Sequence, residues 1–213
     1  VDFDTSLFPD KRVKNKLTNE KETSRHETIR ILYSGTFYSD SGPDIFIRAV
    51  NELIREVPSL GSTLELHFQG SPIDPYISLI NELGLHNNIY NHGYVPHNQA
   101  VLRMQKASIL WLNNEHKKHK HIITLSKIYE YMATRRPIIA LIPEGDTKKI
   151  LKNYTRSYIT SPNNIKEVSR IISKAIGDIQ AGNLKPLNEE WLKAYTTKSI
   201  TQSLAHELDA LID

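Results

Sequence analysis

Short apolar runs alternate with stretches of helical periodicity from Thr28 onward. The apolar runs predict strands at Ile29–Ser34, Leu64–Gln69, Asn88–His92, Ile109–Asn113, Ile138–Ile142 and Ser157–Thr160. The periodic stretches predict helices at Asp44–Val57, Pro75–Leu83, Gln99–Lys106, Leu125–Thr134, Thr147–Asn153 and Ile165–Ile179. Strands and helices in alternation are typical of a parallel sheet with right-handed crossovers. We therefore expect an α/β fold over residues 28–182, with a doubly wound six-stranded parallel sheet.

The two ends of the chain follow a different pattern. Residues 1–27 are rich in charge and almost free of hydrophobic periodicity, which favours a flexible hinge or linker between domains. Residues 183–213 predict a helical tail with a break near Thr196 and Thr197. Its apolar side chains, Trp191 and Leu204 among them, must pack either on this domain or on a missing one.

Composition narrows the class of protein. Of the 213 residues 39% are hydrophobic and 24% charged, which suits a globular domain. No apolar run is long enough to span a membrane. Cysteine is absent, which excludes disulfides and Cys-ligated metal and fits a cytoplasmic location. The net charge of +3 is too small to indicate nucleic-acid binding, but it is compatible with phosphorylated ligands or peripheral contact with the inner membrane face.

The stretch from Thr124 to Ala133 carries the most chemical information. Its apolar residues recur at helical spacing and are expected to form the buried stripe: Leu125, Ile128, Tyr129 and Met132. The open side of the helix would then hold Ser126, Lys127 and Glu130, with Thr124 or Ser126 as the N-cap.

Two interpretations of this open side remain. A lysine in the first turn has the wrong sign for the helix dipole, unless an anion binds there. Backbone N–H groups and the Lys127 amine would then hold a diphosphate, while Glu130 would accept hydrogen bonds from ribose hydroxyls. The alternative is a solvated face with a surface Lys127–Glu130 pair.

The same stretch resembles a known family. SKIYEYMATRRPIIAL (126–141) is similar to a signature of the group 1 (family 4) glycosyltransferases, which have the two-domain GT-B fold. Four more segments are similar to the family in the same order: VDFDTSLFP (1–9), ILYSGTFYSDSGPDIFIRAVNEL (31–53), LELHFQGS (64–71) and LGLHNNIYNHGYVPHNQAVLRMQKASILWL (83–112). The resemblance implies the C-terminal, donor-binding half of a GT-B enzyme, a Rossmann-like domain, with residues 1–9 matching the interdomain hinge.

The resemblance also implies a site for a nucleoside-diphosphate sugar. Glu130 matches the family glutamate that binds the ribose, and Gly35 and Thr36 match the glycine loop that faces the diphosphate. Gly70 matches a glycine that lines the donor cleft. The remaining expected donor-binding positions are Tyr94 and Val95 at the nucleobase, Asn113 at a strand end, and Thr124, Ser126 and Lys127 at the helix start. No catalytic residue is assigned.

Two departures from the family pattern matter. The first of the family's two glutamates falls at Ile122, and the basic pair of the glycine loop falls at Thr36 and Ser41. The phosphate charge must therefore be met by another cation. Lys127 is the first candidate, followed by the Lys117–Lys120 segment and Arg135.

Other polar motifs have simpler explanations. The segment Glu115–His121 holds three histidines, but the lysines between them repel a cation, so we expect no metal and no cofactor. Asp2-Phe3-Asp4 has the spacing of a metal motif but belongs to the hinge. Asp146 is expected to cap a helix, Trp111 to lie in the core, and His92 and His97 to be structural.

The sequence therefore predicts a domain of a glycosyltransferase in glycan synthesis. Sugar would move from a nucleoside-diphosphate sugar to a saccharide or lipid-linked acceptor, without a metal, and the chain would have little activity without its N-terminal domain. Two alternatives remain. One is a non-catalytic nucleotide-sugar-binding or interaction module, and the other is a GT-B-like sugar-nucleotide epimerase. Phosphate-loop and hydrolase motifs are absent.

Overall fold

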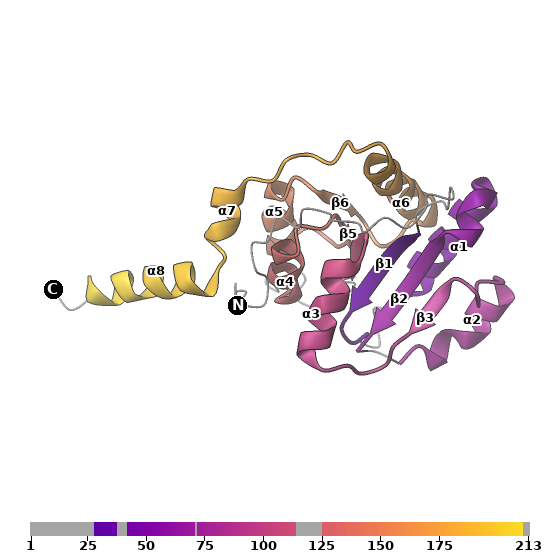
Figure 1. The fold of residues 1–213 in the computed structure, drawn as a ribbon, viewed down its shortest axis with the longest axis horizontal. Helices are drawn as coiled ribbons and strands as arrows, with labels where there is room; N and C mark the ends of the chain where they lie inside the picture. Colours follow the sequence, from indigo (N-terminus) through magenta and orange to yellow (C-terminus); the bar gives the residue numbers. More distant parts are fainter. Residues whose placement is uncertain (1–27, 38–41, 71, 114–124, 211–213) are drawn as a thin grey trace, which may run out of the picture.

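The computed structural model of the chain describes residues 28–37, 42–70, 72–113 and 125–210 (Figure 1). Six parallel strands form one sheet in the order β3-β2-β1-β4-β5-β6. They are β1 (Ile29–Ser34), β2 (Leu64–Gln69), β3 (Ile89–Asn91), β4 (Ile109–Asn113), β5 (Ile138–Leu141) and β6 (Ser157–Thr160). The strand order reverses between β1 and β4, which confirms the expected doubly wound α/β sheet.

Helices cover both faces of the sheet. One apolar cluster joins the sheet to α1 (Asp44–Glu56), α2 (Ile77–Glu82) and α6 (Ile165–Gln180). The other joins it to α3 (His97–Lys106), α4 (Lys127–Ala133) and α5 (Asp146–Asn153), which lie in front of the sheet in Figure 1. Two short 3₁₀ turns, Pro58–Ser62 and Asp74–Tyr76, complete the connections after α1 and β2. In the described residues no helix has the length and apolarity that crossing a bilayer requires.

The central strands are apolar because both of their faces are covered. Every residue of β4 and β5 is buried, as expected for parallel strands between two helical layers. Trp111 of β4 lies in the core as predicted, and its ring stacks on Phe46 of α1 at a centroid distance of 4.0 Å.

Several predicted element boundaries were wrong by one to three residues. β3 is limited to Ile89–Asn91, and β5 ends at Leu141. The helix predicted at Pro75–Leu83 is a 3₁₀ turn followed by α2, while α3 begins two residues early at His97. Asp146 is not an N-cap: Gly145 holds that position, and Asp146, in the first turn, pairs with Lys149 at 2.8 Å. Periodicity identifies a helix, but the terminal hydrogen bonds decide where it ends.

The C-terminal tail divides where the sequence predicted a break. α7 (Glu189–Lys193) packs on the domain through Leu192, which joins the cluster of α3, α4 and α5. Thr196 then caps α8 (Thr197–Asp209) by accepting a hydrogen bond from the Ser199 N–H. α8 has no buried residue and extends away from the sheet (Figure 1), so its apolar side chains Leu204 and Leu208 are exposed.

A chain of hydrogen bonds joins β2 and β3 to the end of α3. The Arg103 guanidinium lies 3.0 Å from His92 Nδ1, His92 Nε2 lies 2.9 Å from His67 Nδ1, and His67 Nε2 lies 2.9 Å from Glu65. Arginine can only donate, so His92 carries its proton on Nε2, and His67 in turn carries its own on Nε2. Both imidazoles are therefore neutral, because a second proton on either ring would face a donor.

From these hydrogen bonds we predict that the free energy of unfolding falls in mild acid. Burial lowers the pKa of His67, and burial together with the Arg103 charge lowers the pKa of His92. Because both folded-state values lie below the unfolded value of about 6.5, their contribution is complete above pH 6.5 and is lost as the pH falls through the folded values. Urea unfolding between pH 5 and 7.5 should show this decline. In the double variant His67→Leu/His92→Leu the free energy of unfolding should depend less on pH. The control His86→Asn, at an exposed site, should keep the wild-type pH dependence. A wild-type pH dependence in the double variant would contradict the role given to the two histidines.

Candidate functional site

The candidate site lies where the strand order reverses. In an open parallel sheet the loops after the two strands at this point separate, which leaves a crevice at the carboxyl ends of the strands. β1 and β4 are the strands concerned, and the segments after them begin at Gly35 and after Asn113. α4 begins at the same edge of the sheet, because it follows β4 and returns toward the opposite edge before β5.

Two glycines allow the loops after β1 and β2 to approach each other. The Gly35 N–H donates to the Gln69 carbonyl at 2.9 Å, and both Gly35 and Gly70 have positive φ values, of 139° and 93°. A side chain at Gly70 would lie 3.2–3.3 Å from the Gly35 backbone, and one at Gly35 would overlap the Lys127 amine. A side chain at either position would therefore force an unfavourable backbone conformation and contact neighbouring atoms too closely.

Lys127 extends from the first turn of α4 across the sheet edge to this glycine loop. Its amine lies 3.3 Å from the Tyr33 hydroxyl and 4.6 Å from the centroid of the Tyr33 ring. The Tyr33 hydroxyl donates onward to the Thr36 carbonyl at 3.2 Å. Burial lowers the pKa of Lys127 from 10.5 to about 8, although the Glu130 carboxylate acts in the opposite direction. A cation is thus held against the loop that the resemblance assigns to a diphosphate.

This position differs from the one predicted for Lys127. The lysine does not project into solvent from an open helix face. Of the predicted buried stripe, Ile128 and Met132 are buried as expected, and Tyr131 and Ala133 are buried although they were not predicted to be. Leu125 and Tyr129 are only partly buried. The prediction was wrong for Lys127 because its side chain reaches Tyr33 of β1, a contact that helical periodicity does not indicate.

The Tyr131 hydroxyl fixes α4 to two strands. It accepts a hydrogen bond from the Ser34 N–H at 2.9 Å and lies 3.2 Å from the Trp111 carbonyl. Its ring is fully buried, and burial raises the pKa of this phenol far above its ordinary value. One side chain of α4 therefore joins the end of β1 to the middle of β4, the two strands at which the strand order reverses.

Glu130 is paired with a residue that the sequence did not indicate. Its Oε1 lies 2.9 Å from His97 Nε2 at the start of α3. The surface Lys127–Glu130 pair, the alternative left open by the sequence, is not among the ion pairs of the described residues. His97 was expected to be a structural histidine, but its side chain is 59% exposed and contacts the carboxylate expected at the ribose.

The segment between β3 and α3 presents the residues expected at the nucleobase. The Gly70 N–H donates to the Gly93 carbonyl at 2.7 Å, which places this segment beside the glycine loop. Tyr94 is 89% exposed and Val95 is partly buried. An aromatic ring this exposed has room for a flat ligand beside it.

The other predicted positions have mixed outcomes. Asn113 is buried and its amide donates to the Gly42 carbonyl at 3.1 Å, so it holds the segment before α1. Ser126 occupies the N-cap of α4 with a helical backbone and makes no side-chain capping bond. Thr124, Ser41, Ile122, the Lys117–Lys120 segment, the Glu115–His121 histidines and the hinge at residues 1–27 lie outside the described residues.

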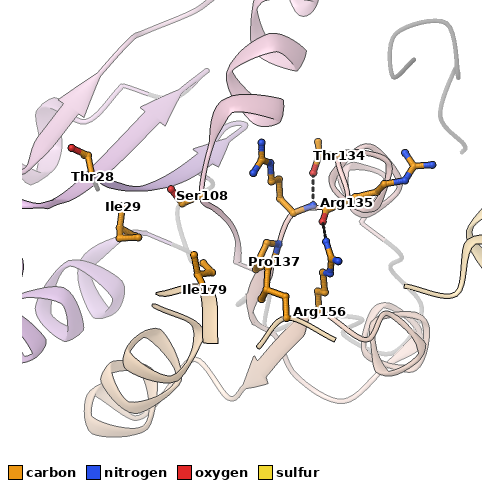
Figure 2. A pocket seen from close by; sticks show the side chains of 10 residues that line it. Thr28, Ile29, Ser108, Thr134, Arg135, Pro137, Arg156 and Ile179 are labelled. Carbon is orange, nitrogen blue, oxygen red and sulfur yellow. Dashed lines mark hydrogen bonds between the residues drawn. The ribbon is translucent and has the colours of Figure 1, made fainter. Parts of the chain in front are cut away.

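Arg135 is on the wrong edge of the sheet to meet the phosphate charge. It lines a separate hollow of about 370 Å³ beside the amino ends of the strands, together with Arg136 and Arg156 (Figure 2). Arg135 pairs with Glu189 of α7 at 3.0 Å, and the Arg156 guanidinium donates to the Arg135 carbonyl at 2.9 Å. Arg136 donates to the Gln105 carbonyl at the end of α3. These arginines satisfy backbone carbonyls where helices end.

Three residues of the site were missed by sequence reasoning: Tyr33, His97 and Tyr131. Tyr131 had a signal, because it follows Glu130 in the family signature, but spacing alone did not show where its hydroxyl points. Tyr33 resembles any aromatic residue of a core strand. The contact of His97 with Glu130 joins residues 33 positions apart, so only the fold reveals it.

The family model described as "Glycosyl transferases group 1" matches residues 15–186, most of the chain. The chain belongs to this family. No curated protein matches this group 1 glycosyltransferase domain.

Solved structures share the fold of this group 1 domain. HepE from Anabaena, in complex with UDP-glucose, aligns with a TM-score of 0.67 at 16% identity, over 86% of this chain and 49% of its own. Sucrose-phosphate synthase from Thermosynechococcus elongatus gives 0.66 at 17%, over 87% and 46%. The C-terminal domain of LpcC, a group 1 family protein of Francisella tularensis, gives 0.57 at 15%, over 85% and 91%.

The chain covers very different shares of the solved structures that it matches. It spans about half or less of the first solved structures that it matches, but nearly all of an isolated C-terminal domain. The likeness confirms the Rossmann-like domain expected of the C-terminal half of a GT-B fold.

The Tyr131 contacts give a prediction for this group 1 domain. Tyr131→Phe should lower the free energy of unfolding by about 1–3 kcal/mol, because the Ser34 N–H loses its acceptor in a partly buried setting. Chemical denaturation measures the change. Tyr90→Phe, which removes a hydroxyl from a side chain 41% exposed, is the matched control and should stay within about 0.5 kcal/mol of the wild type. Equal stabilities for the two variants would contradict the role given to Tyr131.

Proposed function

We propose that the chain is the donor-binding domain of a glycosyltransferase that takes its sugar from a nucleoside-diphosphate sugar. The observation that carries the proposal is the position of Lys127, whose amine lies over Tyr33 and against Gly35 at the strand-order reversal. Family membership and the strand-order reversal, where ligands bind in open parallel sheets, support the same place. Complexes of neighbours with UDP or UDP-glucose support a uridine nucleotide as the first donor to test.

Lys127 would neutralise the diphosphate as the sugar leaves. The bond from the anomeric carbon to the diphosphate oxygen breaks, and negative charge grows on that oxygen, so a fixed cation there favours the transition state. α4 has seven residues, which gives it a weak dipole at best, so the amine supplies most of the positive charge. In the free domain the pKa of Lys127 is lowered to about 8. A bound anion would favour the charged form of the amine and so raise this pKa. This cation is the reason to propose a reaction without a metal.

Glu130 and Tyr94 would hold the nucleoside. A carboxylate accepts two hydrogen bonds from the vicinal hydroxyls of a ribose, and Glu130 lies on α4 one turn beyond Lys127. Tyr94, exposed beside the glycine loop, would lie against the base, with Val95 next to it. Gly35, Thr36 and Gly70 would face the diphosphate through backbone groups.

The acceptor and the remaining catalytic groups would come from a second domain. We propose an N-terminal GT-B domain, with α8 as one contact because its Leu204 and Leu208 side chains are 58% and 52% exposed. The acceptor would be a saccharide or a lipid-linked saccharide in polysaccharide synthesis, at a cytoplasmic site beside the inner membrane face. The net charge of +3 is compatible with that surface.

A non-catalytic binding module is the second candidate. Ile122 stands where the family has its first glutamate, and the glycine loop carries Thr36 and Ser41 in place of basic residues. Such a module would bind the nucleotide sugar by the contacts described above without transferring the sugar.

Binding of the nucleotide tests the site itself. Calorimetric titration with UDP, GDP and ADP should detect binding of at least one nucleotide. The affinity should be unchanged by EDTA and should decline as the pH rises above 8, where Lys127 loses its proton.

Glu130→Ala and Lys127→Met should each weaken nucleotide binding about tenfold or more. Lys127→Met should leave the fold at least as stable, because the buried charge costs free energy below pH 8. Lys166→Met on α6 is the control, and equal affinity in all variants would remove both residues from the site.

Turnover distinguishes the enzyme from its alternatives. The chain alone, given UDP-glucose and a saccharide acceptor, should show little transfer, and the full two-domain protein should restore it. Ordinary rates from the chain alone would contradict the need for a second domain. A full-length protein that binds donor without transfer would favour the binding module, and an altered sugar nucleotide formed without acceptor would favour an epimerase.

A further inference from the structure

Glu130 receives a hydrogen bond from the first residue of α3. His97 Nε2 lies 2.9 Å from Glu130 Oε1, and the two side chains are 59% and 33% exposed. An ionised carboxylate only accepts, so His97 carries a proton on Nε2 and donates it. The bond uses Oε1, and among the described residues no hydrogen bond is made to Oε2.

The contact also joins α4 to the segment between β3 and α3, called the base segment below because the nucleobase is expected there. His97 follows Tyr94, Val95 and Pro96 directly, and Pro96, with its restricted φ, is the N-cap of α3. The direction from which the imidazole reaches Glu130 is therefore set by the same short segment that presents Tyr94. A partly exposed glutamate side chain without a partner samples several rotamers, and fixing it on ligand binding has an entropic cost.

We propose that His97 is a positioning residue for nucleotide binding. It holds the Glu130 carboxylate in one rotamer so that Oε2 faces the ribose hydroxyls, and it links that contact to the base segment. The proposal rests on the function proposed above. It adds a residue that acts through Glu130 and makes no contact with phosphate.

Comparing nucleotides with pyrophosphate, which has no ribose, tests whether His97 acts at the ribose. Because His97 acts only through the carboxylate at the ribose, its removal should weaken nucleotides but leave pyrophosphate, which has no ribose, unaffected. His97→Ala should raise the dissociation constant of the best-binding nucleotide among UDP, GDP and ADP about three- to tenfold, the worth of one oriented hydrogen bond. His97→Gln, whose amide also donates, should recover most of that loss. In the double variant His97→Ala/Glu130→Ala the histidine change should add nothing further.

Controls separate this proposal from the one it rests on. His86→Ala replaces an exposed histidine away from the crevice and should bind as the wild type, and thermal melting should show all variants folded. Wild-type affinity in His97→Ala, with affinity lost in Glu130→Ala, would overturn the role of His97 alone. An equal loss for pyrophosphate, or no rescue by Gln, would also overturn it. Absence of nucleotide binding in the wild type would overturn the proposed function together with this inference.

Discussion

The desolvation of one ammonium group determines most of what this site can do. Lys127 crosses the sheet edge and lies over the Tyr33 ring, where burial lowers its pKa to about 8. A lysine left on a solvated helix face would avoid that cost. Its position is understandable if the free energy is recovered when an anion binds, since a charge in a crevice interacts with a ligand far more strongly than one in water.

The residues around Lys127 allow its amine to lie in this buried position. Gly35 has no side chain, so the amine fits against the loop, and Gly70 lets the next loop approach it. Tyr131 joins α4 to β1 and β4, which fixes the helix that carries the lysine beside the end of β1. We therefore expect stability and binding to depend on different residues: Tyr131 supports the fold at this edge, while the buried Lys127 charge costs folding free energy.

The two edges of the sheet use positive charge differently. At the amino edge, where the helices end, Arg135, Arg136 and Arg156 bind backbone carbonyls and the Glu189 carboxylate. At the carboxyl edge, Lys127 has a tyrosine hydroxyl as its hydrogen-bond acceptor. The polarity of a parallel α/β sheet accounts for the difference, because helix carbonyls need donors at one edge while the other edge is open to anions.

The sequence by itself determined the class and order of the fold. The central strands are apolar because both of their faces are covered, so their positions could be predicted from the apolar runs. The break at Thr196 and Thr197 could be predicted from the loss of periodicity. From the order of the family motifs we then expected Lys127 and Glu130 at the donor. Only the tertiary structure decided where their side chains go. Helical periodicity predicts one buried face of a helix, whereas α4 also contacts the end of β1 through Lys127 and Tyr131, which the periodicity does not indicate. The partner of Glu130 comes from a helix 33 residues earlier, a contact that depends on the packing of α3 beside α4 and has no signature along the chain.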